Sequence, residues 1–265
     1  MSAKVRVLVI ATLSLRAIGA LVSAQTPPDF SGVYRPINAF GPAGGGGGRA
    51  GAPPPAARPA PGQPLPPPTR TAPLSDGSRG RAPDAPQLTP EYMAKWQAIS
   101  KARIAGDTSS DNTARCLPPG MPAMMNMAYG MEVMQTKDKI TFFSELNDAL
   151  RRVYLDGRKP TQKVLDDPTY AGFSTGHWEG DTLVVDTVAL RDNSYIEGFS
   201  PHSDQMTVRE RIRFVEKGIL EDRITVNDPK ALVKPWETVK RYRKAAAGDD
   251  QLREFACAEG IEHAK

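Results

Sequence analysis

Two carboxyl groups in neighbouring β-branched runs are the residues of this chain best suited to acid–base chemistry. The runs Gln205–Glu216 and Ile219–Asp228 meet at a three-residue loop that ends in Gly218. Such a loop, with glycine in the left-handed position, fixes a register that makes Glu210 and Asp222 diagonal neighbours on the inward face. Desolvation and like charge then raise the pKa of one carboxyl group, as a general acid requires. The alternative is that each carboxylate pairs with an inward Arg or hydroxyl group.

The same register predicts an apolar face and a charged face for this hairpin. It sets Phe214 opposite Leu220, Ile212 opposite Asp222, Glu210 opposite Ile224 and Val208 opposite Val226. The other face carries Arg209, Arg211 and Arg213 against Glu221 and Arg223, a pattern typical of a solvated surface.

Two histidines form a second group of candidates. A two-residue turn at Gly180 and Asp181 makes His177 and Asp186 diagonal neighbours. An imidazole oriented by a carboxylate serves general-base catalysis, but no nucleophile motif accompanies it, and a structural hydrogen bond is the alternative. His202 lies at the entry to a strand, on a loop of the kind that carries functional groups.

Metal binding is weakly indicated. The pairs His177-x-Glu179 and His202-x-Asp204 could supply ligands for zinc or iron, yet neither matches an established metal spacing. A cluster of methionines could also bind Cu(I) through the thioether sulfurs. Methionine more often forms an adaptable apolar lining, which here would suit a pocket for an apolar ligand. The methionines concerned are Met121, Met124, Met125, Met127, Met131 and Met134. We therefore expect no metal and no cofactor.

A polar hairpin tip supplies candidate cations. Arg151 and Arg152 follow this tip and could bind an anionic group of a ligand. The alternative is an exposed turn in which Glu145 pairs with Arg152.

The elements that position these residues are short strands. After Gly130 the chain consists of β-branched and aromatic runs separated by turn signals, without helical periodicity. We expect a mainly β, antiparallel up-and-down barrel of about 8–10 strands, because closure removes exposed edges; a β-sandwich is the alternative. The runs are Asp29–Tyr34, Met131–Thr136, Lys139–Leu146, Ala149–Leu155, Thr175–Glu179, Thr182–Leu190, Gln205–Glu216, Ile219–Asp228, Trp236–Lys244 and Leu252–Cys257.

One N-terminal helix precedes these strands. Thr89 and Pro90 give an N-cap and a first helical residue, and Tyr92, Trp96 and Ile99 follow at helical spacing. Residues 36–87 are rich in Pro, Gly and Ala and cannot form a core of their own. We expect a signal peptide at 1–24, a first strand at 25–35, a disordered spacer at 36–87 and the barrel domain at 88–262.

Export follows from the N-terminus and from cysteine usage. A basic start, an apolar run over 7–15 and a small-residue cleavage site at Ala24 predict a signal peptide, and no run is long enough for a transmembrane helix. Cys116 and Cys257 are the only cysteines, and in an oxidising compartment we expect them to pair. The alternative is two buried free thiols.

The apparent basicity comes from outside the predicted barrel. Residues 1–88 hold nine of the 34 Lys and Arg but three of the 30 Asp and Glu, which leaves 25 basic and 27 acidic residues from Thr89 onward. A nucleic-acid-binding domain normally carries a basic excess, so we expect no nucleic-acid partner.

Several motifs resemble a family of exported bacterial proteins. They cover nearly the whole predicted domain, and the resemblance implies export and a shared fold but no particular activity. Tyr34 stands where the family usually has Trp, and Phe173 where His is frequent. The matching segments are DFSGV (29–33), LTPEY (88–92), ARCLPPGMP (114–122), GHWEGDTLVVDT (176–187), Asn147-Asp148, Arg151-Arg152, His202-Ser203, Glu210-Arg211, Asp228-Pro229-Lys230 and Pro235-Trp236.

These observations favour a soluble, lipocalin-like barrel, periplasmic or secreted, that binds a small, largely apolar molecule. The predicted polar contacts are Arg151, His177, His202, Glu210 and Asp222. A lyase, isomerase or hydrolase that uses His177, Asp186, His202 and the two carboxyl groups is the first alternative. An envelope assembly factor that acts through its spacer is the second. The sequence makes no prediction of oligomeric state.

Overall fold

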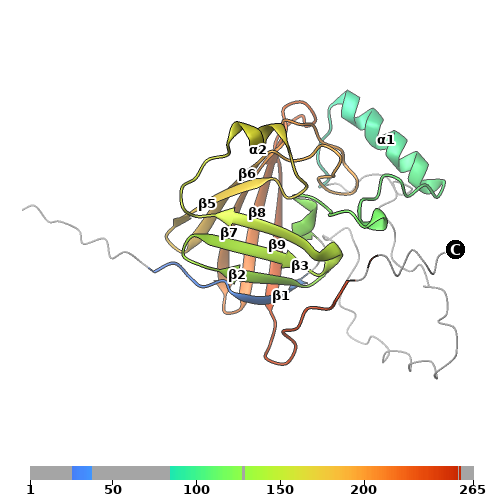
Figure 1. Ribbon diagram of the computed structural model, residues 1–265. Coiled ribbons are helices and arrows are strands. Elements are labelled where there is room, and N and C mark those ends of the chain that lie inside the picture. Colours follow the sequence, from blue (N-terminus) through green and yellow to red (C-terminus); the bar gives the residue numbers. More distant parts are fainter. Residues whose placement is uncertain (1–25, 38–83, 127–128, 256, 258–265) are drawn as a thin grey trace, which may run out of the picture.

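The β-branched and aromatic runs of the sequence close into a β-barrel. The computed structural model describes residues 26–37, 84–126, 129–255 and 257. Nine strands follow one another around the barrel, and β1 pairs with β9 to close it (Figure 1). The predicted barrel is therefore confirmed, and the sandwich alternative is excluded. The strands are β1 (Gly32–Ile37), β2 (Met131–Gln135), β3 (Lys139–Ser144), β4 (Ala149–Tyr154), β5 (Phe173–Glu179), β6 (Thr182–Val188), β7 (Thr207–Glu216), β8 (Ile219–Asn227) and β9 (Trp236–Lys244).

Both predicted hairpin registers are confirmed. In β7 and β8, Phe214 lies opposite Leu220 and Ile212 opposite Asp222, with a bulge after Phe214. In β5 and β6, Trp178 lies opposite Leu183. Gly218 and Gly180 adopt positive φ angles of 74° and 63°, which glycine tolerates at no steric cost. Turn chemistry therefore determines which residues face the interior.

One strand pair departs from the expected up-and-down meander. β4 and β5 are parallel and share two residue pairs, Val153 with Ser174 and Tyr154 with Thr175. The chain between them, which includes the short helix α2 (Gln162–Asp166), crosses from one end of the barrel to the other. The first residues of β4 consequently have no strand partner on the β5 side. We call this gap in the hydrogen-bonded wall the seam.

The predicted helix is α1 (Pro90–Ile104), and it lies outside the barrel wall (Figure 1). Thr89 occupies the N-cap and Pro90 the first turn, as the sequence predicts. Three short 3-10 helices are η1 (Thr113–Arg115), η2 (Ala123–Asn126) and η3 (Leu146–Asp148). Within the described ranges, no helix is long and apolar enough to cross a membrane.

The C-terminal segment corrects one predicted strand. Residues 252–255 form no strand, because β1 and β9 already pair with each other and leave no edge for a tenth strand. Instead, the Arg253 amide donates to Glu145 Oε1 over 2.8 Å, and the predicted disulfide joins Cys116 to Cys257. The predicted signal peptide and nearly all of the predicted spacer lie outside the described residues; β1 extends to Ile37, within the range assigned to the spacer.

Candidate functional site

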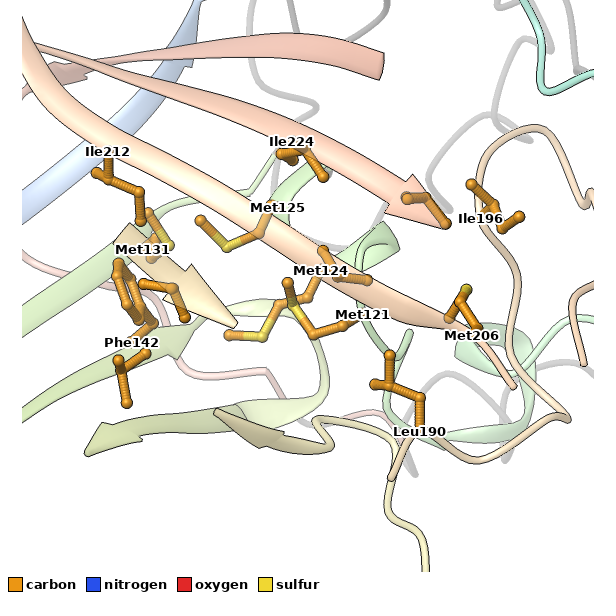
Figure 2. Close-up of a cluster of buried hydrophobic side chains, with 14 of the residues drawn as sticks. Met121, Met124, Met125, Met131, Phe142, Leu190, Ile196, Met206, Ile212 and Ile224 are labelled. Atoms are coloured by element: carbon orange, nitrogen blue, oxygen red, sulfur yellow. The ribbon is translucent and has the colours of Figure 1, made fainter. Parts of the chain in front are cut away.

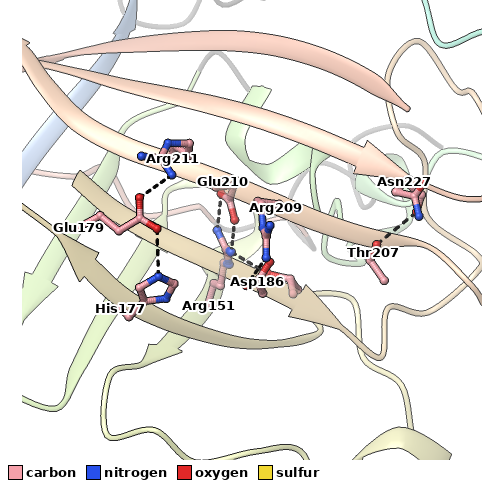
Figure 3. Close-up of polar contacts among 10 residues, drawn as sticks. Arg151, His177, Glu179, Asp186, Thr207, Arg209, Glu210, Arg211 and Asn227 are labelled. Atoms are coloured by element: carbon pink, nitrogen blue, oxygen red, sulfur yellow. Dashed lines mark hydrogen bonds and ion pairs between the residues drawn. The ribbon is translucent and has the colours of Figure 1, made fainter. Parts of the chain in front are cut away.

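A buried ion pair crosses the barrel interior. Arg151 of β4 is 1% exposed and Glu210 of β7 is 0% exposed. Both Nη atoms of the guanidinium donate to the two carboxylate oxygens of Glu210, Nη1 to Oε1 over 2.8 Å and Nη2 to Oε2 (Figure 3). Nε also donates to Ser174 Oγ over 3.2 Å, and Nη2 to Thr187 Oγ1 over 3.0 Å. The arginine predicted to bind an anionic ligand group thus binds an anion of the protein itself.

Asp222 lies beside this pair and has no cation of its own among the described residues. It is 0% exposed and sits diagonally from Glu210, as the register predicts. No hydrogen-bond donor among the described residues reaches either of its carboxyl oxygens. Burial, and then the negative charge of Glu210, raise the pKa of Asp222 well above its usual value. The protonated form is favoured, and its hydroxyl group can donate to Glu210. The alternative of pairing with an inward Arg therefore applies to Glu210 and not to Asp222.

Two residues of β9 complete the polar interior. Lys240 is the cross-strand neighbour of Asp222, but its Nζ lies 3.6 Å from Glu197 Oε2, in the loop between β6 and β7. Glu197 also accepts a 2.7 Å hydrogen bond from Asn126 Nδ2. The buried Tyr242 hydroxyl donates to the Met125 carbonyl, and burial followed by the charges of Asp222 and Glu210 raises the pKa of this phenol. Lys240 therefore forms an ion pair with Glu197, and the phenol of Tyr242 remains neutral.

Methionine side chains fill the rest of the interior. Met121, Met124, Met125 and Met131 are all buried, and they pack among the inward side chains of the barrel (Figure 2). Met134 is 41% exposed, and Met127 lies outside the described residues. Four of the six methionines are thus apolar lining, as predicted, but their own thioethers occupy space that was expected for a ligand. Their neighbours in this cluster include Phe142, Leu190, Ile196, Met206, Ile212 and Ile224.

A pocket of about 230 Å³ opens at the seam. Ala149 and Arg151 are successive inward residues of β4, about 7 Å apart along the strand. The pocket therefore lies one inward position along β4 from Arg151, with the Met124 side chain in its wall. Its lining residues are Pro118, Gly120, Met124, Ala149, Leu150, Thr169, Tyr170 and Ala171.

A second pocket, of about 440 Å³, lies around the β7–β8 turn and includes Phe214 and Lys244. It is larger, but the ring of Phe214 packs against Phe30, and Phe30 packs against Trp178, with centroid distances of 5.1 and 5.2 Å. These three rings form an apolar cluster beside this pocket. The seam pocket is the better candidate, because its lining residue Ala149 is the inward neighbour of Arg151 on β4, whereas Phe214 of the second pocket is four residues from Glu210 on β7.

His177 and Asp186 lie on the outer face of the barrel. The predicted register is correct, since His177 pairs with Val184 and Asp186 with Thr175. The imidazole Nε2, however, lies 3.3 Å from Glu179 Oε1, and Asp186 accepts bonds of 2.7 and 3.0 Å from Arg209 (Figure 3). The predicted hydrogen bond between His177 and Asp186 is therefore wrong, because nearer charges on the same face bind both side chains.

His202 is buried in the loop that precedes β7. Its Nε2 accepts from the Ser194 hydroxyl over 2.8 Å when Nδ1–H donates to the Ser203 carbonyl, also over 2.8 Å. Burial lowers the pKa of His202, which keeps the imidazole neutral. Asp204, predicted as a possible metal partner, is 74% exposed at its side chain and lies 3.9 Å from Lys230. Among the described residues, no group of three His, Cys, Asp or Glu side chains is arranged to hold a metal ion.

Comparison with known proteins assigns no family. No family model matches the chain, and no curated protein matches it. Solved structures of the fluorescent protein UnaG are similar to part of it. The wild type has 17% identity and a TM-score of 0.27, covering 51% of this chain and 89% of that one. Two mutants have identities of 15% and 16% and TM-scores of 0.28 and 0.27, covering 51% and 44% of this chain and 86% and 71% of theirs. The barrel assignment accordingly rests on the strand pairing described above.

Proposed function

We propose that this barrel binds a small, largely apolar molecule, which enters at the seam and places its polar group against Asp222. The observation that carries the proposal is the fully buried carboxyl group of Asp222, which accepts no hydrogen bond from the described residues and has the carboxyl group of Glu210 as its hydrogen-bond neighbour. A buried polar group without a hydrogen bond costs about 1–3 kcal/mol, and a ligand that bonds to it recovers this cost on binding.

Rearrangement of the methionine side chains makes room for the ligand. Met124 lines the seam pocket and belongs to the interior cluster. Methionine is unbranched and has three rotatable bonds, so it can change rotamer and make room for an apolar group at modest cost. An apolar cavity with a few convergent polar groups is the usual form of a small-molecule site.

The acid–base enzyme alternative has less support. His177 lies on the outer face, and His202 bonds within its own loop, so neither imidazole accompanies the carboxyl pair. The buried carboxyl pair alone supplies binding groups, and binding is the function it supports best.

A neutral fluorescent apolar probe, N-phenyl-1-naphthylamine, tests the proposal. Ala149→Trp fills the seam pocket, and Leu150→Trp does so from a partly exposed position that tolerates bulk. We expect both changes to weaken probe binding by about tenfold or more, whereas Val239→Trp, at a 43% exposed position on the outer face of β9, leaves it unchanged. Thermal melting confirms that each variant is folded. No probe binding to the wild type, or equal binding to all four proteins, would show that the proposal is wrong.

We also propose that the chain is exported and belongs with the exported bacterial proteins that its motifs resemble. The disulfide between Cys116 and Cys257 supports this, because such bonds persist mainly in oxidising compartments. The mass of the mature protein from its native cells should correspond to an N-terminus at Gln25. An intact N-terminus in cytoplasmic protein would contradict it.

A further inference from the structure

The carboxyl groups of the barrel interior outnumber its cations. Arg151 pairs with Glu210, and Lys240 pairs with Glu197 at the barrel mouth. Asp222 is left over, and within the described structure it has neither a cation nor a hydrogen-bond donor. The interior therefore contains one more carboxyl group than it has cations to neutralise.

Resting on the proposed function, we infer that the ligand is a lipophilic amine, whose ammonium group binds between Asp222 and Glu210. An ammonium group carries three donors and no acceptor, and so it matches a site that presents carboxyl oxygens. Its positive charge balances the ionised form of Asp222. The apolar part of the ligand lies among the methionines in the direction of the seam.

Other ligand classes fit less well. A carboxylate or phosphate group would lie against two carboxyl groups, and the Arg151 guanidinium that would attract it already donates through both Nη atoms to Glu210. A neutral acceptor can take one hydrogen bond from the protonated Asp222, but it leaves the second carboxyl oxygen without a donor. An amine bonds to both carboxyl groups and supplies the missing charge.

The proton balance follows directly. When an ammonium ion binds, Asp222 loses its carboxyl proton to solvent, and no covalent bond forms or breaks. Affinity should therefore rise with pH up to the raised pKa of Asp222, level off above it, and fall once the amine itself loses its proton, at about pH 10.4 for an alkyl ammonium like that of Lys. The charged and titratable groups that face Asp222 are Glu210 on β7, Arg151 on β4, and Lys240 and Tyr242 on β9.

Competition between matched probes tests the inference. n-Decylamine and 1-decanol share one apolar chain and differ in the polar group, and each is titrated against the protein and bound N-phenyl-1-naphthylamine at pH 7. We expect decylamine to displace the probe at least about tenfold more effectively, since a hydrogen bond to a charged group contributes about 1.5 kcal/mol or more. Calorimetry in two buffers of different ionisation enthalpy should show release of a proton for decylamine and none for decanol.

Two variants locate the effect. Asp222→Asn keeps the shape of the side chain but cannot ionise, and it should remove both the preference for the amine and the proton release. Asp186→Asn, which changes a carboxylate on the outer face, should keep both. Equal displacement of N-phenyl-1-naphthylamine by decylamine and by decanol would overturn the amine inference and leave apolar binding intact. Retained preference in Asp222→Asn would overturn the site, and failure of N-phenyl-1-naphthylamine to bind the wild type would overturn the proposed function as well.

Discussion

Replacement of Asp222 by Asn should stabilise the protein, and the gain should depend on pH. Asp222 is fully buried beside Glu210, and burial and that neighbouring charge raise the pKa of its carboxyl group. In the unfolded chain this group titrates near its ordinary value of about 3.9. The folded protein thus keeps a proton that the unfolded chain releases. Asn presents a similar shape and an N–H donor toward Glu210, with no proton to lose.

The size of the effect follows from proton linkage. At a pH below the unfolded pKa, both states hold the proton and the wild type pays no penalty. As pH rises from about 4 toward the raised folded pKa, the wild type loses about 1.4 kcal/mol per pH unit relative to Asp222→Asn. Between pH 4 and pH 7 the difference in unfolding free energy should grow by up to about 4 kcal/mol. A carboxyl group with a raised folded pKa has this sign; a salt-bridged one has the opposite sign.

Urea unfolding of both proteins at pH 4, 5.5 and 7 measures the difference. The contributions of titratable groups that do not interact with Asp222 cancel when the two unfolding free energies are subtracted, so the difference reports on Asp222 together with its neighbour Glu210. A difference that is independent of pH would refute the reasoning. So would a wild type that is more stable than the variant at pH 7, because this would mean that Asp222 is ionised and paired, with Lys240 the available cation.

Three further predictions concern stability, all measured by urea unfolding. Arg151→Met should lower the unfolding free energy by about 3–5 kcal/mol, because it leaves Glu210 buried without its cation. The double variant Arg151→Met with Glu210→Leu should recover most of that loss. Equal stability of the single and the double variant would contradict this. Burial lowers the pKa of His202, so below about pH 6.5 the unfolded chain takes up a proton before the folded protein does. The wild type should therefore lose stability relative to His202→Gln as pH falls below that value. Parallel pH profiles of the two unfolding free energies would contradict this. Reduction of the disulfide between Cys116 and Cys257, which are 141 residues apart, should cost up to about 5 kcal/mol on the chain-entropy account, and an unchanged midpoint would contradict it.

The sequence predicts the hairpins well because their determinants are local. Gly180 and Gly218 set the turns, and strand alternation then fixes which face each residue occupies. The turn and the strand alternation are enough to place Glu210 and Asp222 together inside the barrel, without any long-range contact. It also placed Glu221 on the outer face, where the arginines Arg223 and Arg241 bind it and bury it to 1% exposure.

The partners of these residues could not be predicted in the same way. Arg151 and Glu210 are 59 residues apart, on β4 and β7, and they meet only because the barrel closes. The error at His177 has a different cause: the diagonal register is right, but Glu179 binds the imidazole and Arg209 binds the carboxylate of Asp186. Lys240 was missed although alternation from Trp236 along β9 indicates an inward position.

The other buried carboxylates support the proposal that Asp222 binds a ligand, because each of them accepts hydrogen bonds from the protein. Glu145 accepts from Arg35 and from two backbone amides, and Asp228 accepts from the Ser203 hydroxyl and three backbone amides. Glu210 and Glu221 both accept from arginines. Asp222 differs from all of them, because it accepts no hydrogen bond from the described residues and its hydrogen-bond neighbour is another carboxyl group, that of Glu210. The cationic ligand that we propose would give the carboxyl group of Asp222 both a hydrogen-bond donor and a counter-ion.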